Sequence, residues 1–247
     1  GEGKHATVTT MTTNLTRVEA EERSALLSVE HYAVDLDLSG AADPQVATFG
    51  SRTTVDLTGR ADGTTFIDLI APSVRAVSIN GTALDPAEAF DGTRVRFPVR
   101  HGANRLIILA DAAYSRSGEG MHRFVDPADG LTYLYTQYEP TDARRVAAVF
   151  DQPDLKASYT FQVLAPAAWT VLNNTAAESI TDLSAEAAGT AGTDISSAAP
   201  GPDPADFETV GTGSLTMSFV RSRLNVRIDE EEEILPVAKQ AGIRIGA

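Results

Sequence analysis

The chain has 247 residues, with 34 acidic against 20 basic side chains and a formal net charge of −14 at pH 7. Nucleic acids and anionic membranes would repel such a chain, so neither is expected as a partner. It has no cysteine, which excludes disulfides and thiolate metal sites. No apolar run reaches the roughly 18 residues of a membrane span, and no basic-then-apolar signal pattern opens the chain, so the cytoplasm is the expected location.

The first segment, residues 1–14, is small, polar and aperiodic, and is predicted to be a disordered leader. A helix is predicted over residues 16–27, because Thr16 and Glu19 have the spacing of a capping box. From residue 29 the apolar period changes to two, which predicts a strand with one buried face.

Short alternating segments then follow at regular spacing. A type I′ hairpin is predicted at Asn80-Gly81, which separates two of them. Strands with turns every 8–12 residues and no alternation with helices are typical of an all-β fold, here an antiparallel β-sandwich or a pair of saddle-shaped sheets with two short helices. The expected strands cover residues 47–57, 64–70, 74–79, 94–99 and 105–110.

The most informative stretch is residues 131–156, which follows a predicted loop over residues 114–130. It begins as a strand in which Gln137 and Glu139 share one face by the two-residue period. Pro140 ends this strand because its ring removes a ladder donor, and a short helix is predicted over residues 141–149.

The last third of the chain changes in composition. Strands are predicted from residue 157 and over residues 168–172, where Trp169 is expected to be a core anchor. Residues 176–206 are rich in Ala, Gly, Ser, Thr and Asp and are predicted to be a flexible excursion within a domain that spans residues 15–228. Residues 229–247 are predicted to be an acidic C-terminal tail.

Two runs of the central stretch, TQYEPTDARR and FDQPDLKASY, resemble the gluzincin aminopeptidases, the aminopeptidase N family of zinc enzymes. The resemblance implies an N-terminal β-domain, packed against a thermolysin-like catalytic domain in an enzyme that removes N-terminal residues from peptides. It also implies that Gln137 and Glu139 line the substrate pocket, with Glu139 binding the free α-amino group. The implied partners are therefore the catalytic domain of the same enzyme and peptides with a free N-terminus.

The family's own catalytic motifs, HExxH and a G-x-M-E-N loop, are not found in this sequence. The four histidines are not spaced four apart, as a zinc pair on a helix requires. We therefore expect no catalytic residue and no metal ligand in this chain, which alone should be inactive, and zinc only in the implied full enzyme. The histidines are His5, His31, His101 and His122.

Three alternatives stay open from the sequence. Spacing alone favours Glu139 as a cap of the following helix or as an ion-pair partner of Arg144 or Arg145. His122 could approach the pocket, although a structural role is the commoner one for a single histidine. The whole chain could instead be a stand-alone β-sandwich that binds carbohydrate or protein, or a structural interaction module without catalysis.

Overall fold

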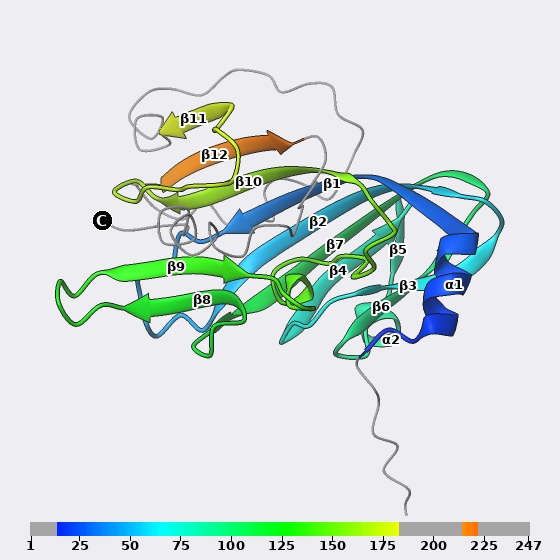
Figure 1. Ribbon diagram of the computed structural model, residues 1–247, viewed down its shortest axis with the longest axis horizontal. Coiled ribbons are helices and arrows are strands. Elements are labelled where there is room, and N and C mark those ends of the chain that lie inside the picture. The colour runs from blue at the N-terminus through cyan, green and yellow to red at the C-terminus, as the bar shows by residue number, and fades with distance from the viewer. Residues whose placement is uncertain (1–13, 183–213, 222–247) are drawn as a thin grey trace, which may run out of the picture.

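The computed structural model describes residues 14–182 and 214–221. Among these residues the dominant feature is one ten-stranded sheet, in the order β11-β12-β10-β1-β2-β7-β4-β5, with β8 added beside β7 and β9 beside β8. Figure 1 shows it as a strongly curved layer, with the β8–β9 hairpin projecting from one side. Its strands are β1 Leu27–Asp37, β2 Thr48–Gly59, β4 Ser73–Ile79, β5 Thr82–Leu84, β7 Gly102–Ser115, β8 Gly120–Val125, β9 Thr132–Gln137, β10 Ser158–Pro166, β11 Ser179–Asp182 and β12 Ser214–Arg221.

A second, two-stranded sheet lies near the helical end of the molecule, together with α1 (Figure 1). It consists of β3 Gly63–Asp68 and β6 Arg94–Val99. The helical elements in the described part of the chain are α1 Arg17–Leu26, α2 Pro86–Ala89 and the single 3₁₀ turn η1 Ala143–Arg145. The all-β prediction is confirmed. Two strand pairs, β1 with β10 and β7 with β8, are parallel, so the sheet is mixed rather than wholly antiparallel.

Two local features predicted from the sequence, the capping box and the type I′ hairpin, are present in the structure. In the capping box before α1, the Thr16 hydroxyl accepts from the Glu19 N–H at 3.3 Å, and the Glu19 carboxylate accepts from the Thr16 N–H at 2.8 Å. In the β4–β5 hairpin, Asn80 and Gly81 have φ values of 53° and 78°, as a type I′ turn requires.

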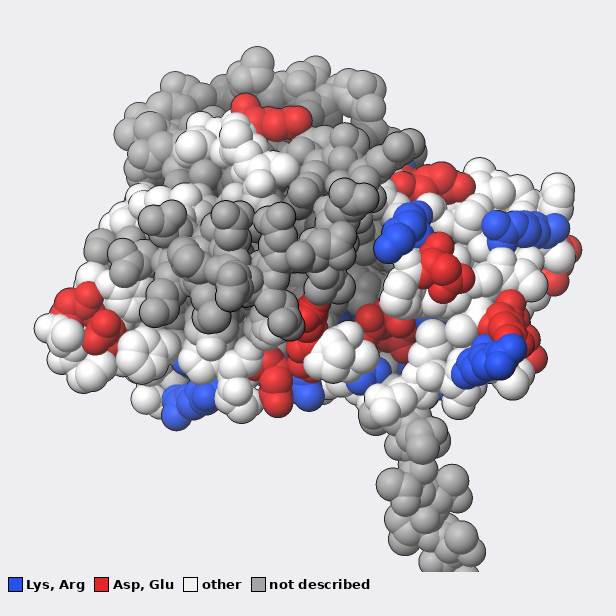
Figure 2. Space-filling view, viewed as in Figure 1, with Lys and Arg blue, Asp and Glu red and all other residues white. Residues whose placement is uncertain are grey.

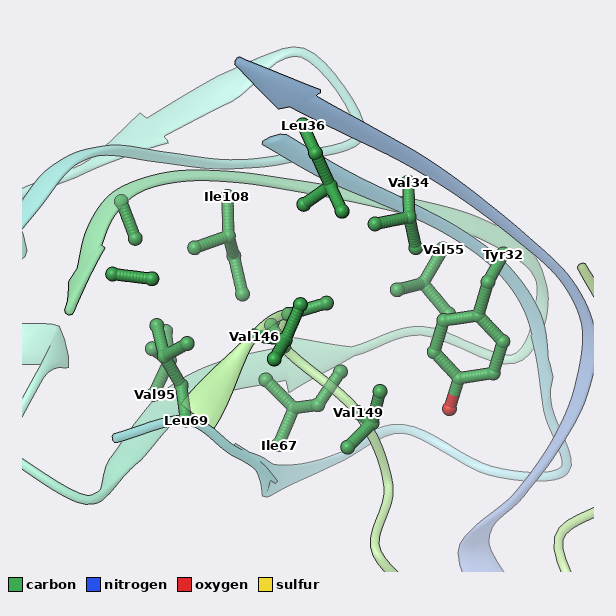
Figure 3. Close-up of a cluster of buried hydrophobic side chains, with 14 of the residues drawn as sticks. Tyr32, Val34, Leu36, Val55, Ile67, Leu69, Val95, Ile108, Val146 and Val149 are labelled. Carbon is green, nitrogen blue, oxygen red and sulfur yellow. The ribbon is translucent and has the colours of Figure 1, made fainter. Parts of the chain in front are cut away.

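The core lies between the concave face of the large sheet, the β3–β6 pair and the buried segment 146–150 (Figure 3). Tyr32 on β1, Ile67 on β3 and Val149 all point into this space. Each is at most 7% exposed, and burying an apolar side chain of this size contributes roughly 1.5–3 kcal/mol.

Segment 146–150 is fixed by hydrogen bonds to both sheets. The N–H of Val149 donates to the Asp68 carbonyl and its own carbonyl accepts from Asp68, both at 3.0 Å. The Phe150 N–H donates to the Tyr32 hydroxyl at 3.0 Å, and the Ala148 N–H donates to the Thr53 hydroxyl at 3.1 Å. These partners replace helical hydrogen bonds. The helix predicted over residues 141–149 is therefore wrong beyond the one turn of η1.

A buried ion pair ties α1 to this core. Arg23 donates through Nη1 to Asp68 Oδ2 at 3.0 Å, and both side chains are 1% exposed. Its Nε donates to Gln152 Oε1 at 2.8 Å. The guanidinium also lies against the rings of Phe66 and Phe150, at 4.9 and 5.1 Å from their centroids. Arg23 is thus the buried one among several contacts that hold the helix onto the body of the domain; the Arg94–Glu19 ion pair at 2.7 Å is another.

Three further predictions need correction. The predicted loop over residues 114–130 instead contains the end of β7 and the whole of β8, because residues 120–125 pair with β9. Residues 168–172 form no strand: the Trp169 N–H closes a turn on the Pro166 carbonyl at 2.9 Å, although Trp169 is buried as expected. Within the predicted flexible excursion, Ser179–Asp182 form β11 by pairing with β12. The leader up to residue 13, most of the excursion and the acidic tail lie outside the described residues.

The charged side chains of the face in Figure 2 are of both signs around α1, β3 and β6. Acidic side chains gather at the free end of the β8–β9 hairpin, whose connecting loop contains Asp126 and Asp129. Among the described residues, no helix combines the length and the apolar character needed to cross a membrane.

Candidate functional site

Gln137 and Glu139 lie at the end of β9, where the strand gives way to a bend. Gln137 is the last strand residue and Glu139 follows two positions later, just before Pro140, with a cis peptide bond between Glu139 and Pro140. Both side chains are exposed, whereas Leu134 on the opposite face of β9 is fully buried. Gln137 therefore faces outward, as the two-residue period predicted. The prediction that Glu139 shares its strand face is wrong, because β9 ends at Gln137 and Glu139 lies in the turn before Pro140.

Neither the Gln137 amide nor the Glu139 carboxylate has a hydrogen bond or an ion pair to another residue in the described part of the chain. The two nearby arginines have other contacts: Arg145 Nε donates to Asp142 Oδ1 at 2.7 Å, and Arg144 Nη2 donates to the Thr141 hydroxyl at 3.3 Å. Asp142 occupies the N-cap position of η1. The alternative that Glu139 caps this turn or pairs with an arginine is therefore wrong.

The bend itself is closed by backbone and side-chain contacts. The Asp142 N–H donates to the Tyr138 carbonyl at 2.8 Å, which places Glu139 and Pro140 inside the turn. The Arg145 N–H then donates to the Asp142 carbonyl at 3.0 Å. The backbone around Glu139 is therefore held by a defined loop.

His122 supports the hairpin next to Gln137. Its Nδ1 accepts from the Gly118 N–H at 3.1 Å, and its ring lies 4.7 Å from the ring of Tyr135, its cross-strand partner. These contacts agree with the structural role for His122. They also place the imidazole on the same hairpin as Gln137.

The β8–β9 hairpin and the bend after it carry several exposed apolar side chains. Phe124 and Val125 are each 47% exposed, and Tyr135 and Tyr138 are 38% and 36% exposed. These four residues are here called the hairpin patch; of them, Tyr135 and Tyr138 lie next to Gln137 and Glu139 along the chain.

The described residues contain no group of three or more His, Asp or Glu side chains arranged to hold a metal ion, so they do not fit a zinc site. His31, for example, contacts the hydroxyl of Ser158 through Nδ1 at 2.8 Å and that of Thr160 through Nε2 at 3.1 Å.

Two contacts of this region were not predicted from the sequence. The Asp154 carboxylate accepts from the Ser24 hydroxyl of α1 at 2.5 Å. Gly120 on β8 is the second of these contacts. Its missing side chain makes room for Arg145, whose Cβ would lie 2.7 Å from a Cβ at Gly120. A positive φ of 59° at Gly120 is the local signal, and sequence alone does not reveal it.

Comparison with known proteins gives a family match over the region of Gln137 and Glu139. Residues 96–190, which include Gln137 and Glu139, match the Peptidase M1 N-terminal domain. The chain is 52% identical over 164 residues to an aminopeptidase N from Streptomyces lividans, covering 66% of this chain and 19% of that protein. It is 37% identical over 86 residues to a probable M1 family aminopeptidase from Encephalitozoon cuniculi, covering 34% of this chain and 10% of that protein.

A crystal structure of a mutant M1 zinc metallopeptidase from Deinococcus radiodurans has a similar fold, with a TM-score of 0.52 and 20% sequence identity. The similarity covers 79% of this chain and 39% of that one. The solved structure shows a likeness of fold, and the matched segment adds a likeness in sequence to the Peptidase M1 N-terminal domain. Over residues 96–190 the chain is similar to the N-terminal domain of M1 peptidases, and it spans about a fifth of the aminopeptidase N that it resembles at 52% identity.

Proposed function

We propose that this chain is the N-terminal domain of a zinc-dependent aminopeptidase that removes N-terminal residues from peptides. Its part is to supply Gln137 and Glu139 to a substrate pocket that is completed by a catalytic domain. The observation that carries the proposal is the exposed Glu139 carboxylate, which has no partner among the described residues and lies beside Gln137 within the matched segment.

The chemistry follows from what an aminopeptidase must recognise. A peptide's free N-terminus is an ammonium group, and a carboxylate about 3 Å away gives a charge-assisted hydrogen bond that is roughly twice as strong as a neutral one. The Gln137 amide can both donate and accept, which suits a peptide backbone. Gln137 and Glu139 are separated by one residue at the end of β9 and both are exposed, so we infer that both side chains reach one ligand. Such an anchor accelerates hydrolysis by positioning the scissile bond.

The hairpin patch supports a second part of the proposal, which concerns the partner. A catalytic domain that shares the pocket must approach Glu139, and Tyr135 and Tyr138 lie within four residues of it and are exposed. We place the edge of the interdomain contact on this patch. The metal and the water that it activates belong to the other domain, and the cytoplasm stays our prediction for where the enzyme works.

Replacement of Glu139 by Gln in the full-length enzyme tests this function. The change keeps the shape of the side chain and removes its charge, so we expect a loss of about 1–3 kcal/mol in transition-state stabilisation. That corresponds to roughly one to two orders of magnitude in kcat/KM for substrates with a free amine. The stability of the 247-residue chain should stay within about 0.5 kcal/mol, because Glu139 is exposed. Unchanged kinetics would contradict the proposal.

A stand-alone binding module is the second candidate, and the exposed aromatic side chains of the hairpin patch are the observation in its favour. Such a module would bind a carbohydrate or protein ligand through Phe124 and Tyr135 without any other domain. Its ligand binding would survive Glu139→Gln and be lost in Phe124→Ala with Tyr135→Ala. The aminopeptidase domain predicts instead that the chain alone neither holds stoichiometric zinc nor cleaves aminoacyl-arylamides.

A further inference from the structure

We propose that Arg145 is a positioning residue that fixes Gln137 and Glu139 relative to each other. The inference rests on the proposed function for its effect on catalysis, but its structural part stands on the contacts of this chain. Those contacts form a closed ring around the end of β9.

The first half of the ring crosses the hairpin. Gln137 on β9 pairs with Gly120 on β8. The aliphatic part of Arg145 lies directly on Gly120, and a Cβ placed there would approach Arg145 Cβ, Cδ and Cγ at 2.7, 3.3 and 3.6 Å. The approach to the Cβ of Arg145 involves the fixed root of that side chain, so rotation of the arginine cannot relieve it.

The second half of the ring returns along the chain. Arg145 Nε donates to Asp142 Oδ1 at 2.7 Å, and the Asp142 side chain is only 13% exposed. The Asp142 N–H in turn donates to the Tyr138 carbonyl at 2.8 Å, closing the bend that contains Glu139. Arg145 is thus the one side chain in this ring that contacts both the strand opposite Gln137 and the turn that carries Glu139.

The consequence is geometric. Glu139 lies outside the ladder of β9 and is exposed, so strand pairing does not fix it. Its direction depends on the bend, and the bend is joined to the hairpin through Arg145. If the contacts of Arg145 with Gly120 and Asp142 are lost, Gln137 stays in the sheet while Glu139 moves independently of it. The two side chains that are to bind one substrate then no longer have a fixed separation.

The structural part is tested in the 247-residue chain by ¹⁵N relaxation. In the wild type, the Glu139 amide should have an order parameter near the rigid value of about 0.85; in Arg145→Met, which keeps the stem but removes the ion pair, it should fall toward about 0.6. The Gln137 amide should stay rigid in both. Arg145→Lys should restore part of the order, because the ammonium can still bind Asp142. Arg116→Met is the matched control, since Arg116 is exposed and has no hydrogen bond or ion pair to the described residues.

The functional part is tested in the full-length enzyme with two competitive inhibitors that differ only in a free amine. The measured quantity is the ratio of their inhibition constants, which reports recognition of the amine. Arg145→Met and Gly120→Ala should each lower this preference about tenfold, since a misplacement of about 1 Å can cost up to about 10²-fold. In a Glu139→Gln background, Arg145→Met should have no further effect on the ratio.

The outcomes separate the two proposals. If Glu139→Gln leaves the amine preference unchanged, the proposed function fails. If Glu139→Gln lowers it but Arg145→Met does not, or if Arg145→Met weakens both inhibitors equally, Arg145 has only a general structural role and the inference is overturned. A rigid Glu139 amide in Arg145→Met would overturn it as well, whatever the kinetics.

Discussion

The buried ion pair between Arg23 and Asp68 gives the sharpest prediction about stability. Replacing Arg23 by Met keeps a long unbranched side chain between the rings of Phe66 and Phe150, but it leaves the Asp68 carboxylate 1% exposed and without its strongest partner. The remaining neighbours of that carboxylate are the Asp151 N–H at 3.3 Å and Arg94 Nε at 3.9 Å. Neither replaces a buried charge-assisted bond of 3.0 Å.

The expected loss is about 3–5 kcal/mol, the range for breaking a buried pair by removing one partner. For a domain of this size, that corresponds to a fall in Tm of roughly 6–20 °C. Urea unfolding of the 247-residue chain, followed by the fluorescence of its single tryptophan, Trp169, measures it directly, since Trp169 is only 6% exposed. The matched control is Arg17→Met, because the Arg17–Glu21 pair is 90% and 61% exposed and should contribute less than about 0.5 kcal/mol.

A double variant separates the pair from its surroundings. Arg23→Met combined with Asp68→Asn removes both charges, so its loss should be smaller than that of Arg23→Met alone, at about 1–2 kcal/mol. If Arg23→Met costs less than about 1 kcal/mol, or if the losses at the two positions simply add, the claim that this pair holds α1 to the core is refuted.

Three further predictions concern single contacts. Tyr32→Phe should destabilise the chain by about 1–2 kcal/mol in urea unfolding, because the buried Phe150 N–H loses its acceptor at 3.0 Å; an unchanged midpoint would contradict it. Hydrogen bonding from Arg94 lowers the pKa of Glu19 to about 2, below its ordinary 4.5. Above pH 5 the free energy of unfolding of the wild type should therefore exceed that of Glu19→Gln by about 1 kcal/mol, and this difference should vanish as the pH falls toward 2. A difference that does not change with pH would contradict this prediction. Gly81→Ala should lower the free energy of unfolding by about 1–2 kcal/mol because of the φ of 78° alone, since nothing lies within 4 Å of an added Cβ. Gly81→Asn should lower it by less, because Asn tolerates positive φ. Equal losses in the two variants would argue against a backbone cause.

Features that depend on neighbouring residues could be predicted from the sequence. The capping box of Thr16 and Glu19 needs only a spacing of three, and the Asn80-Gly81 turn needs only two residues that tolerate positive φ. The outward face of β9 followed from the two-residue period. The outward position of Gln137 was therefore predicted correctly, whereas Glu139 lies in the turn beyond the strand, and the role of both stays a prediction.

Features that depend on distant partners could not. The parallel pairing of β1 with β10 joins residues more than 100 positions apart, and alternation gives a strand but not its direction. Segment 146–150 has helix-compatible residues, yet its backbone bonds go to Asp68, Thr53 and Tyr32. Contacts with elements remote in the sequence overrode local preference there. The contact between Gly120 and Arg145 could not be predicted for the same reason, because the two residues lie 25 positions apart.

Glu139 is the centre of the functional account, and a double-mutant cycle between Glu139 and the substrate's amine tests it most directly. The four affinities are those of wild-type and Glu139→Gln full-length enzyme, each for a substrate-like inhibitor with a free amine and for the same inhibitor with hydrogen in its place. The cycle cancels effects of either change that do not involve the other group. The account predicts a coupling of about 1–3 kcal/mol, with the amine-free inhibitor binding equally to both enzymes. A coupling near zero would show that Glu139 does not bind the amine.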